Sequence, residues 1–440
     1  MPSQEVQEAQ TPPPRLDAET NPSVGNLYAY YVLTVLFVVY VFNFIDRQIL
    51  AILLEPIKKD LKISDTALGF LTGFAFAVFY TFAGLPLAQL ADRWVRRSLI
   101  ALSLATWSVM TVVSGLARGF PDLALARIGV GIGEAGASPP AHSLLSDYFS
   151  PQKRATVLAI YASGIYVGVG LGYWIGGWIN DVYGWRAAFF VVGAPGLFMA
   201  LLVRLTIREP VRGMSEQYQV RTQPYTLKEA WRFFVSLRTG RYLALAGGLH
   251  AFVSYGLGAW IPAFFVRVHH MTTGELGQWL SWITAIGGGA GAFFGGWIAD
   301  HWARRQPRAR IYIGLIGVLL AIPTVAATLL IQNTHWALLA YLPAILFSTL
   351  WVGPAFAIAQ DLVPPAMRAM ASAVFLFIVT IIGMGAGPQT VGILNDLIGA
   401  PDAIRYSLLA AAIVMNLAAA VFFWLAGKTL VQDLEAKARL

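Results

Sequence analysis

The sequence YVFNFIDRQIL, from Tyr40 to Leu50, places an aspartate beside an arginine within an apolar segment. That segment runs from Leu27 to Leu54 and is long enough to cross a bilayer, since roughly 20 apolar residues suffice. A charge near the centre of a membrane helix costs about 2.5–3.5 kcal/mol even on lenient insertion scales. Asp46 and Arg47 are therefore predicted to face a polar interior as part of a functional site. The alternative is a structural ion pair between helices, or a pair close enough to the surface to be solvated.

The composition is typical of a polytopic membrane protein. Of the 440 residues, 57% are hydrophobic and 12% are charged, which is about half the charged fraction of a soluble domain. The sequence contains no cysteine, which excludes disulfides, thiol catalysis and cysteine-based metal sites. Residues 1–26 are polar and proline-rich, and we predict a disordered cytoplasmic tail rather than a cleaved signal peptide.

The chain can be divided into twelve apolar spans joined mostly by short loops. When the spans are assigned alternately from a cytoplasmic N-terminus, most of the lysines and arginines fall in the cytoplasmic loops. This bias predicts that both termini are cytoplasmic, and it accounts for the net charge of +8 without nucleic-acid binding. The predicted location is the cell membrane, or the inner membrane if the protein is bacterial. The spans cover residues 28–54, 65–91, 97–117, 121–147, 154–180, 186–206, 242–266, 274–299, 310–331, 335–360, 367–396 and 402–427.

The longest polar stretch separates two groups of six spans. We predict a six-helix bundle at 27–207, a cytoplasmic linker at 208–241, a second six-helix bundle at 242–428 and a cytoplasmic tail at 429–440. Within the linker, the segment LKEAWRFFVSLR from Leu227 has amphipathic spacing with basic residues. This pattern predicts a helix lying at the membrane surface.

The two bundles repeat one another in sequence, which predicts the fold class. Two parallel repeats of six helices are related by an axis along the membrane normal, and their binding sites lie between them near the midplane. We therefore expect an all-α polytopic membrane protein with twelve transmembrane helices in two parallel six-helix repeats. Three groups of residues recur at nearly constant offsets. About 208 positions separate Ser64 from Thr272, Gly69 from Gly277, Asp92 from Asp300, Arg96 from Arg304 and Arg97 from Arg305. About 214 positions separate Asp147 from Asp361, Pro151 from Pro365 and Arg154 from Arg368, and about 215 separate Gly172 from Gly387, Gly177 from Gly392, Asn180 from Asn395 and Asp181 from Asp396.

Two loops carry the pattern of a known superfamily. LADRWVRR at Leu90–Arg97, echoed by GWIADHWARR at Gly296–Arg305, resembles the loop signature of the major facilitator superfamily. NFIDRQILA at Asn43–Ala51 and LARIGVGIGEAGASPPAHSLLSDYF at Leu125–Phe149 resemble its Spinster branch. The resemblance implies a transporter of amphipathic lipids such as sphingosine-1-phosphate and lysophospholipids, with roles for the Asp46–Arg47 pair and for the arginine and glutamate of the fourth span. A first-span motif similar to NFIDR also occurs in organic-anion and organic-cation symporters.

Arg127 and Glu134 lie within the fourth span. They are seven residues apart, so on a helix they share a face at about 10.5 Å separation along the axis, too far for a direct salt bridge. Each must find another partner: water, substrate, or the Asp46–Arg47 pair. The repeat-equivalent positions hold Tyr341 and Ser348, which predicts a more apolar wall opposite.

These residues suggest how a substrate would bind. Tyr40, Asn43 and Arg47 share a helix face that we predict to line the cavity. Arg47 and Arg127 would bind an anionic head, because a guanidinium suits phosphate or carboxylate. The expected partner is a lipid-like or organic-anion small molecule, with its tail along the second bundle.

Asp46 and Glu134 are the acidic residues predicted to lie deep in the membrane. Burial raises a carboxyl pKa and a nearby arginine lowers it, so such a group can exchange a proton as access alternates. We predict proton coupling through Glu134, assisted by Asp46. In the alternative, both carboxylates stay ionised in a passive facilitator.

A further set of charged residues is predicted to gate the cytoplasmic side through salt bridges between the bundles. Alternatively, the arginines of this set only determine the orientation of the chain in the membrane. The set comprises Asp92, Arg96, Asp147, Arg154, Asp300, Arg304 and Arg368.

No other chemistry is expected. Gly131, Gly133 and Gly136 match a nucleotide-binding pattern, but no strand precedes them. His142 and His250 are single membrane histidines and are expected to form packing hydrogen bonds rather than a metal site. The sequence therefore predicts no enzyme activity, cofactor or metal, and a monomer whose partners are its substrate, protons and membrane lipid.

Overall fold

The computed structural model describes residues 26–211, 226–306, 308–364 and 367–438. The described residues are almost entirely helical and include no strand. The predicted N-terminal tail lies outside them, apart from Asn26, which begins the first helix.

The first half consists of six membrane-crossing segments, and three of them are interrupted or extended by a short element. The second segment contains a π-helical turn, and the fourth is broken at Gly136–Ala137. The elements are α1 (Asn26–Ile52), α2 (Leu54–Leu61), α3 (Asp65–Gly69), η1 (Phe70–Phe74), α4 (Ala75–Arg93), α5 (Arg96–Gly115), α6 (Phe120–Ala135), α7 (Ser138–Tyr148), α8 (Pro151–Tyr183) and α9 (Trp185–Thr206).

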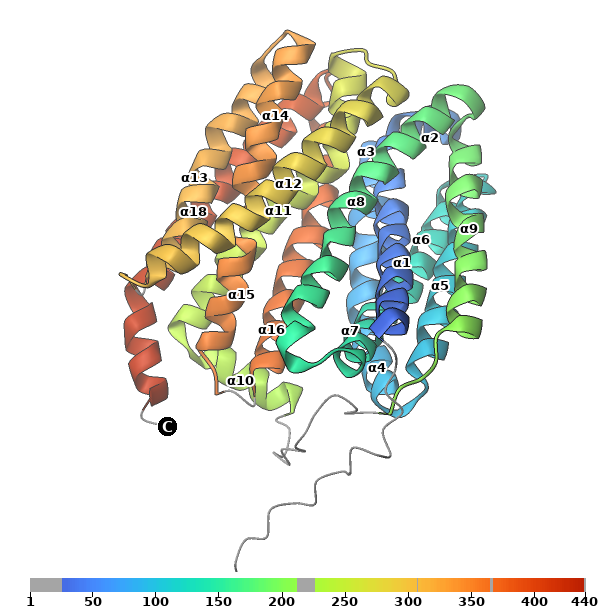
Figure 1. Cartoon of the computed structure of the whole chain (residues 1–440). Helices are drawn as coiled ribbons and strands as arrows, with labels where there is room; N and C mark the ends of the chain where they lie inside the picture. Colours follow the sequence, from blue (N-terminus) through green and yellow to red (C-terminus); the bar gives the residue numbers. More distant parts are fainter. Residues whose placement is uncertain (1–25, 212–225, 307, 365–366, 439–440) are drawn as a thin grey trace, which may run out of the picture.

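The second half repeats this arrangement after a short helix. Its elements are α10 (Leu227–Ser236), α11 (Arg238–Val268), α12 (Thr273–Ala303), α13 (Ala309–Leu330), α14 (Thr334–Thr349), α15 (Val352–Asp361), α16 (Arg368–Val379), η3 (Thr380–Ala386), α17 (Gly387–Ile398) and α18 (Ala403–Ala438). Figure 1 shows the two halves side by side, with α10 at one end of the molecule.

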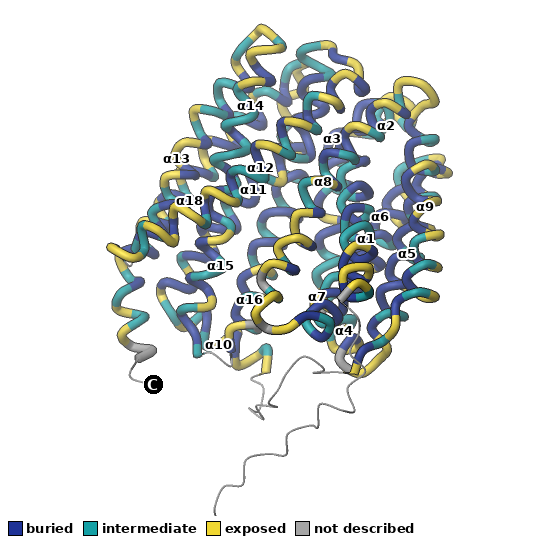
Figure 2. The backbone as a smooth tube through the Cα atoms, in the orientation of Figure 1, coloured by how far each residue is buried: buried dark blue, intermediate teal, exposed yellow. Residues whose placement is uncertain are grey.

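Ten segments of the described chain are long and apolar enough to cross a membrane. The other two predicted spans are the broken α6–α7 pair, with helices of 16 and 11 residues, and the glycine-rich α12 of 31 residues. Together they complete the two six-helix halves. Figure 2 shows buried positions inside each half and exposed ones on the outside. Exposed apolar side chains such as Phe198 and Leu205 of α9 are suited to contact with lipid.

Helices α11 and α18 both extend beyond their predicted spans. Helix α11 begins at Arg238 rather than at 242, and α18 continues through the predicted tail 429–440 as far as Ala438. The two differences have one cause, because the end of α18 packs on the start of α11. Asp433 accepts a hydrogen bond from the backbone nitrogen of Thr239 at 2.7 Å, and the hydroxyls of Thr239 and Thr429 lie 2.8 Å apart.

The helix starts follow their sequence signals. Ser64 and Thr272 cap α3 and α12, accepting hydrogen bonds from the backbone nitrogens of Ala67 at 3.1 Å and Glu275 at 3.2 Å. Thr226 starts the amphipathic α10 with a capping box. Such caps satisfy backbone groups that have no partner within the helix.

The bundle of helices has two ends. The linker end is where α9 ends and α10 lies, and the far end is where α2 and the turn between α13 and α14 lie (Figure 1). At the linker end of the first half, Arg96 is 1% exposed and forms ion pairs with Asp147 at 2.5 Å and Glu209 at 2.7 Å. Its guanidinium also donates to the Ser143 hydroxyl at 2.7 Å. Arg96 therefore ties α5 to α7 and to the chain beyond α9.

We expect the substitution Arg96→Gln to destabilise the protein strongly. Removing one partner of a buried ion pair costs about 3–5 kcal/mol, and here two carboxylates lose the same guanidinium. Thermal unfolding of purified protein in detergent measures the effect. The repeat-equivalent substitution Arg304→Gln is the control, because Arg304 is exposed; equal losses of stability in the two variants would contradict the assignment.

Candidate functional site

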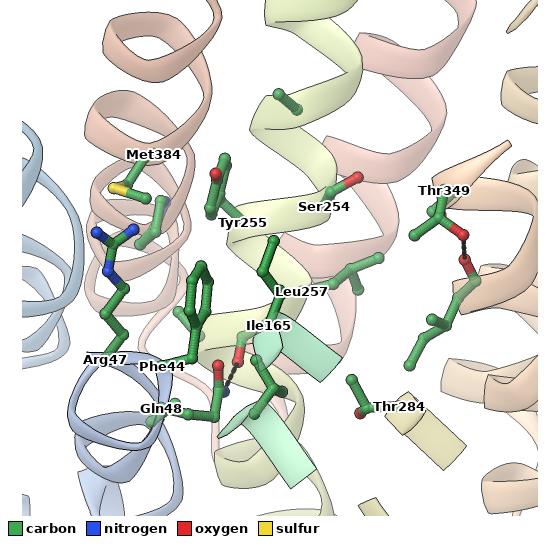
Figure 3. Close-up of a pocket in the computed structure, with 18 of the residues that line it drawn as sticks. Phe44, Arg47, Gln48, Ile165, Ser254, Tyr255, Leu257, Thr284, Thr349 and Met384 are labelled. Carbon is green, nitrogen blue, oxygen red and sulfur yellow. Dashed lines mark hydrogen bonds between the residues drawn. The ribbon is translucent and has the colours of Figure 1, made fainter. Parts of the chain in front are cut away.

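A cavity of about 510 Å³ lies between the two halves. It is lined by α1, α4, α6 and α8 of the first half and by α11, α14, α15 and α16 of the second, among other elements. Figure 3 shows Arg47, Phe44 and Gln48 on one side of it and Ser254, Tyr255 and Thr349 on the other. The site therefore lies between the repeats.

One face of α1 forms part of the cavity wall. Phe44, Arg47, Gln48 and Ala51 line it, at the spacing of a single helix face. Arg47 of the predicted face lines the cavity. Tyr40, one turn before Phe44 on the same face, stacks on Tyr161 of α8 with ring centroids 4.3 Å apart, and neither Tyr40 nor Asn43 is among the lining residues. The close packing of α8 on α1 turns Tyr40 toward α8.

Asn43 is buried beside the charged residues instead. It is 2% exposed and interacts with the Glu134 carboxylate. Its predicted contact with substrate stays a prediction.

Two ion pairs join α1 to α6. Arg47 Nε lies 2.5 Å from Glu134 Oε2, and Arg127 Nη1 lies 3.8 Å from Asp46 Oδ1. The hydroxyl of Thr111 on α5 also donates to Asp46. Arg127 and Glu134 thus pair with α1 rather than with each other, which their seven-residue spacing allows.

The four charged groups differ in their access to the cavity. Arg127, Asp46 and Glu134 are each 1–2% exposed, whereas the side chain of Arg47 is 17% exposed. Arg47 and Arg127 are both lining residues. The cavity therefore has two guanidinium groups in its wall, and their carboxylate partners lie behind them.

Aromatic rings surround Arg47. Its guanidinium lies 5.0 Å from the ring centroids of Phe44 and Phe76 and 4.7 Å from that of Tyr80. Phe76 is also 5.5 Å from the guanidinium of Arg127. Cation–π contacts of this kind stabilise a desolvated cation. Phe76 and Tyr80 come from α4, and no spacing in the sequence connects them with the first span.

The second half contributes an uncharged wall. Tyr341 and Ser348, which occupy the repeat positions of Arg127 and Glu134, line the cavity, with the apolar side chains of Trp351, Phe356 and Val379 nearby along it. The predicted asymmetry of charge between the halves is therefore present in the structure. His250 packs behind this wall, 2.7 Å from Asn416 and 3.0 Å from the Ser348 carbonyl.

A backbone carbonyl of α11 joins the halves at the cavity. Pro262 has no N–H to offer the carbonyl of Gly258 four residues earlier. That oxygen accepts hydrogen bonds from Gln48 at 3.3 Å and Tyr173 at 3.1 Å, both in the first half. Sequence reasoning missed this contact, although the proline was a signal that a carbonyl would be free.

The predicted gating residues lie at the linker end, and their ion pairs described here stay within one half. Arg96 pairs with Asp147 in the first half, and Arg310 pairs with Asp300 and Asp361 in the second. Arg154 donates to the Ser146 carbonyl. Of the others, Arg304 and Arg368 are exposed, and Asp92 lies near the end of α4.

Further polar contacts between the halves lie at the far end. Arg267 of α11 pairs with Glu55 and with Asp65, each at 2.5 Å, and Lys58 also reaches Asp65 at 2.5 Å. No sequence motif indicated a role for these residues. Elsewhere at this end Arg186 donates to Asp60 within the first half, and this hydrogen bond lowers the pKa of the Asp60 carboxyl.

Comparison with known proteins agrees with this architecture. The family model of the Major Facilitator Superfamily matches residues 36–388. The chain belongs to this superfamily, whose members are transporters and not enzymes. The MFS-type efflux pump of Mycolicibacterium smegmatis is 32% identical over 97% of this chain and 99% of that protein.

Within the superfamily the chain is Spinster-like. A solved bacterial homologue of the human lysosomal transporter Spinster, inward-facing and unoccupied, matches with a TM-score of 0.82 and 32% identity, over 93% of this chain and 98% of that one. Protein spinster of Drosophila melanogaster is 28% identical over 84% of this chain and 62% of that protein. Among the organic-acid transporters, the probable L-galactonate transporter of Escherichia coli is 28% identical over 60% of each chain.

We expect Arg47→Gln and Glu134→Gln to act non-additively on stability. Each single substitution leaves a buried charge without its partner, at about 3–5 kcal/mol, whereas the double substitution removes both charges. The loss of thermal stability in the double variant should therefore be well below the sum of the two single losses. Glu134→Gln combined with the distant Arg186→Gln is the control, and additive losses in both pairs would argue against a direct ion pair.

Proposed function

We propose that this Spinster-like protein is a secondary active transporter that moves an amphipathic, lipid-like anion by alternating access. Sphingosine-1-phosphate and lysophospholipids exemplify the class. The observation that carries the proposal is a single cavity with two guanidinium groups in one wall and an apolar wall opposite. An anionic head would bind at Arg47 and Arg127, because guanidinium groups form strong charge-assisted hydrogen bonds to phosphate and carboxylate.

The tail would lie along the second half. Trp351, Phe356 and Val379 line the cavity there, and burial of an alkyl chain gains about 0.8 kcal/mol per CH₂ group. A substrate with both parts can use both walls at once. One chain supplies the complete cavity, so a monomer is the proposed working unit.

Transport is proposed to be coupled to protons through Glu134, with Asp46 assisting. The Arg47–Glu134 ion pair supports this proposal, because an anionic head that binds Arg47 competes with the carboxylate for it. A carboxylate displaced from its guanidinium in a buried site favours its neutral, protonated form. Substrate and proton binding are thereby linked through one side chain.

The linker end is proposed to face the cytoplasm. The positive-inside bias of the loops supports this orientation, with both termini on that side of the cell membrane, or of the inner membrane in a bacterium. The polar contacts of Arg267 between the halves lie at the far end, which corresponds to an inward-facing state. The linker-end residues Asp92, Arg96, Asp147, Arg154, Asp300, Arg304 and Arg368 would gate the opposite state.

A soluble organic anion is the second candidate, supported by the similarity to the probable L-galactonate transporter. Purified protein in liposomes distinguishes the two classes. We expect saturable binding and movement of a labelled lysophospholipid, with competition by alkyl phosphates that strengthens with chain length. A sugar acid that competes better than every alkyl phosphate would favour the second candidate instead, and a cleaved lipid product would contradict transport.

Replacing Glu134 with Gln is expected to abolish the effect of a pH gradient on transport while substrate binding stays measurable. The amide keeps the shape of the side chain and cannot exchange the proton. Uptake into proteoliposomes with and without an imposed pH gradient measures the coupling. A gradient effect equal to that of the unsubstituted protein would rule out Glu134 as the coupling residue, and the exposed Glu275→Gln serves as the matched control.

A further inference from the structure

The Asn–Asp pairs that recur in the two halves have no part in the cavity, yet both lie in contacts between the halves at the far end. In the first contact, between α8 and α12, Asp181 accepts hydrogen bonds from the Thr273 hydroxyl at 2.5 Å and from the backbone nitrogen of Gly274 at 2.8 Å. Asn180 donates to the same hydroxyl at 2.8 Å. Asp181 of the first half thus binds the first turn of α12 in the second half.

The second contact, between α17 and α3, is built in the same way. Asp396 accepts hydrogen bonds from the backbone nitrogens of Asp65 at 3.1 Å and Thr66 at 2.7 Å. Asn395 donates to the Asp65 carboxylate at 3.0 Å. Asp65 and Thr66 are the repeat equivalents of Thr273 and Gly274, as Asn395 and Asp396 are of Asn180 and Asp181.

Repeated glycines bring the backbones together at both contacts. A Cβ atom on Gly177 would lie 2.1 Å from the Thr273 carbonyl oxygen, and one on Gly392 would lie 2.3 Å from that of Asp65. Neither distance is compatible with a side chain, so only glycine permits this approach. Equivalent positions of the repeat therefore form both contacts.

The interaction is strong because of where the carboxylates sit. The first backbone N–H groups of a helix have no partner within the helix, and its N-terminus carries a partial positive charge. The N-caps Ser64 and Thr272 satisfy the third N–H of α3 and α12. Asp396 accepts from the first and second N–H groups of α3, and Asp181 accepts from the second N–H of α12. Separating the halves therefore removes these partners from both helix starts.

We infer that Asn180–Asp181 and Asn395–Asp396 form two matching clasps that hold the far end closed, and that both must release before the cavity can open there. The clasps are not equal. The one at Thr273 is made by uncharged groups around Asp181, whereas the one at Asp65 includes a second carboxylate, neutralised by Arg267 and Lys58. Arg267 therefore supports the second clasp specifically.

Distance measurements between spin labels test this inference directly. The chain contains no cysteine, so Val182→Cys in α8 and Leu330→Cys in α13, both exposed near the far end, provide a unique label pair across the halves. Without further change, we expect mainly the short distance of the closed far end. Asp181→Asn or Asp396→Asn should raise the ratio of the long to the short population by roughly tenfold, the effect of losing a hydrogen bond to a charged group, and the double variant by more.

The control removes the same kind of cap within one half. Asp433 accepts a hydrogen bond from the backbone nitrogen of Thr239, and both belong to the second half. Asp433→Asn should leave the distance distribution unchanged. An unchanged distribution in the Asp181→Asn, Asp396→Asn double variant, or an equal shift in the Asp433→Asn control, would overturn the inference.

Substituting the glycines at the two contacts tests the clasps without removing a charge. Gly177→Ala and Gly392→Ala place a methyl group against the opposing backbone and should also increase the long-distance population. Gly289→Ala on α12 meets no atom within 4 Å and should have no effect. If both Gly177→Ala and Gly392→Ala fold and keep the short distance, the close approach does not hold the far end closed and the clasp assignment fails.

Discussion

The cost of leaving a charge unpaired within the membrane constrains this structure more than any other single interaction. Asp46 and Arg47 are neighbours on α1 and must point in different directions, so they cannot satisfy one another side by side. Arg127 and Glu134 on α6 provide the partners, one for each. Because separating either pair would expose a buried charge, α1 and α6 are held in one register.

That pairing also decides what a ligand can reach. The carboxylates lie behind the guanidinium groups, and the aromatic rings of Phe44, Phe76 and Tyr80 enclose Arg47. The cavity therefore presents positive charge on the side of the first half and uncharged groups on the side of the second. A ligand that approaches Arg47 meets a group already paired with Glu134, and the proposed proton coupling rests on this pair.

The rest of the architecture supports movement of one half against the other. Arg96 in the first half and Arg310 in the second tie helices together within their own halves at the linker end. Between the halves, one apolar cluster contains residues of both, such as Leu68 and Trp260, and at the far end glycines and side chains that reach helix starts add further contacts. The polar bonds among these can exchange their partners for water when the halves part.

The fold and part of the site were predictable because they depend on local patterns. Apolar runs of membrane length, the bias of basic residues and the repeat led to twelve spans in two halves, and the spacing of Arg127 and Glu134 showed that they needed partners elsewhere. Tyr40, Arg47 and Ala51 share one face of α1, and the packing of α8 decides which of them reach the cavity: Tyr161 covers Tyr40, whereas Arg47 and Ala51 line the cavity. Helix α18 also extends through most of the predicted cytoplasmic tail, where Asp433 accepts a hydrogen bond from the backbone nitrogen of Thr239.

The sequence by itself determined which segments cross the membrane, that the halves repeat, and that four charges had to be gathered in the first half. These follow from the energetics of burial along a single helix. The tertiary structure alone decided which charge pairs with which, that Phe76 and Tyr80 surround Arg47, that Pro262 frees a carbonyl for Gln48, and that Asp181 and Asp396 reach across to the other half. Such contacts join residues far apart in the chain, and their geometry is set by how whole helices pack.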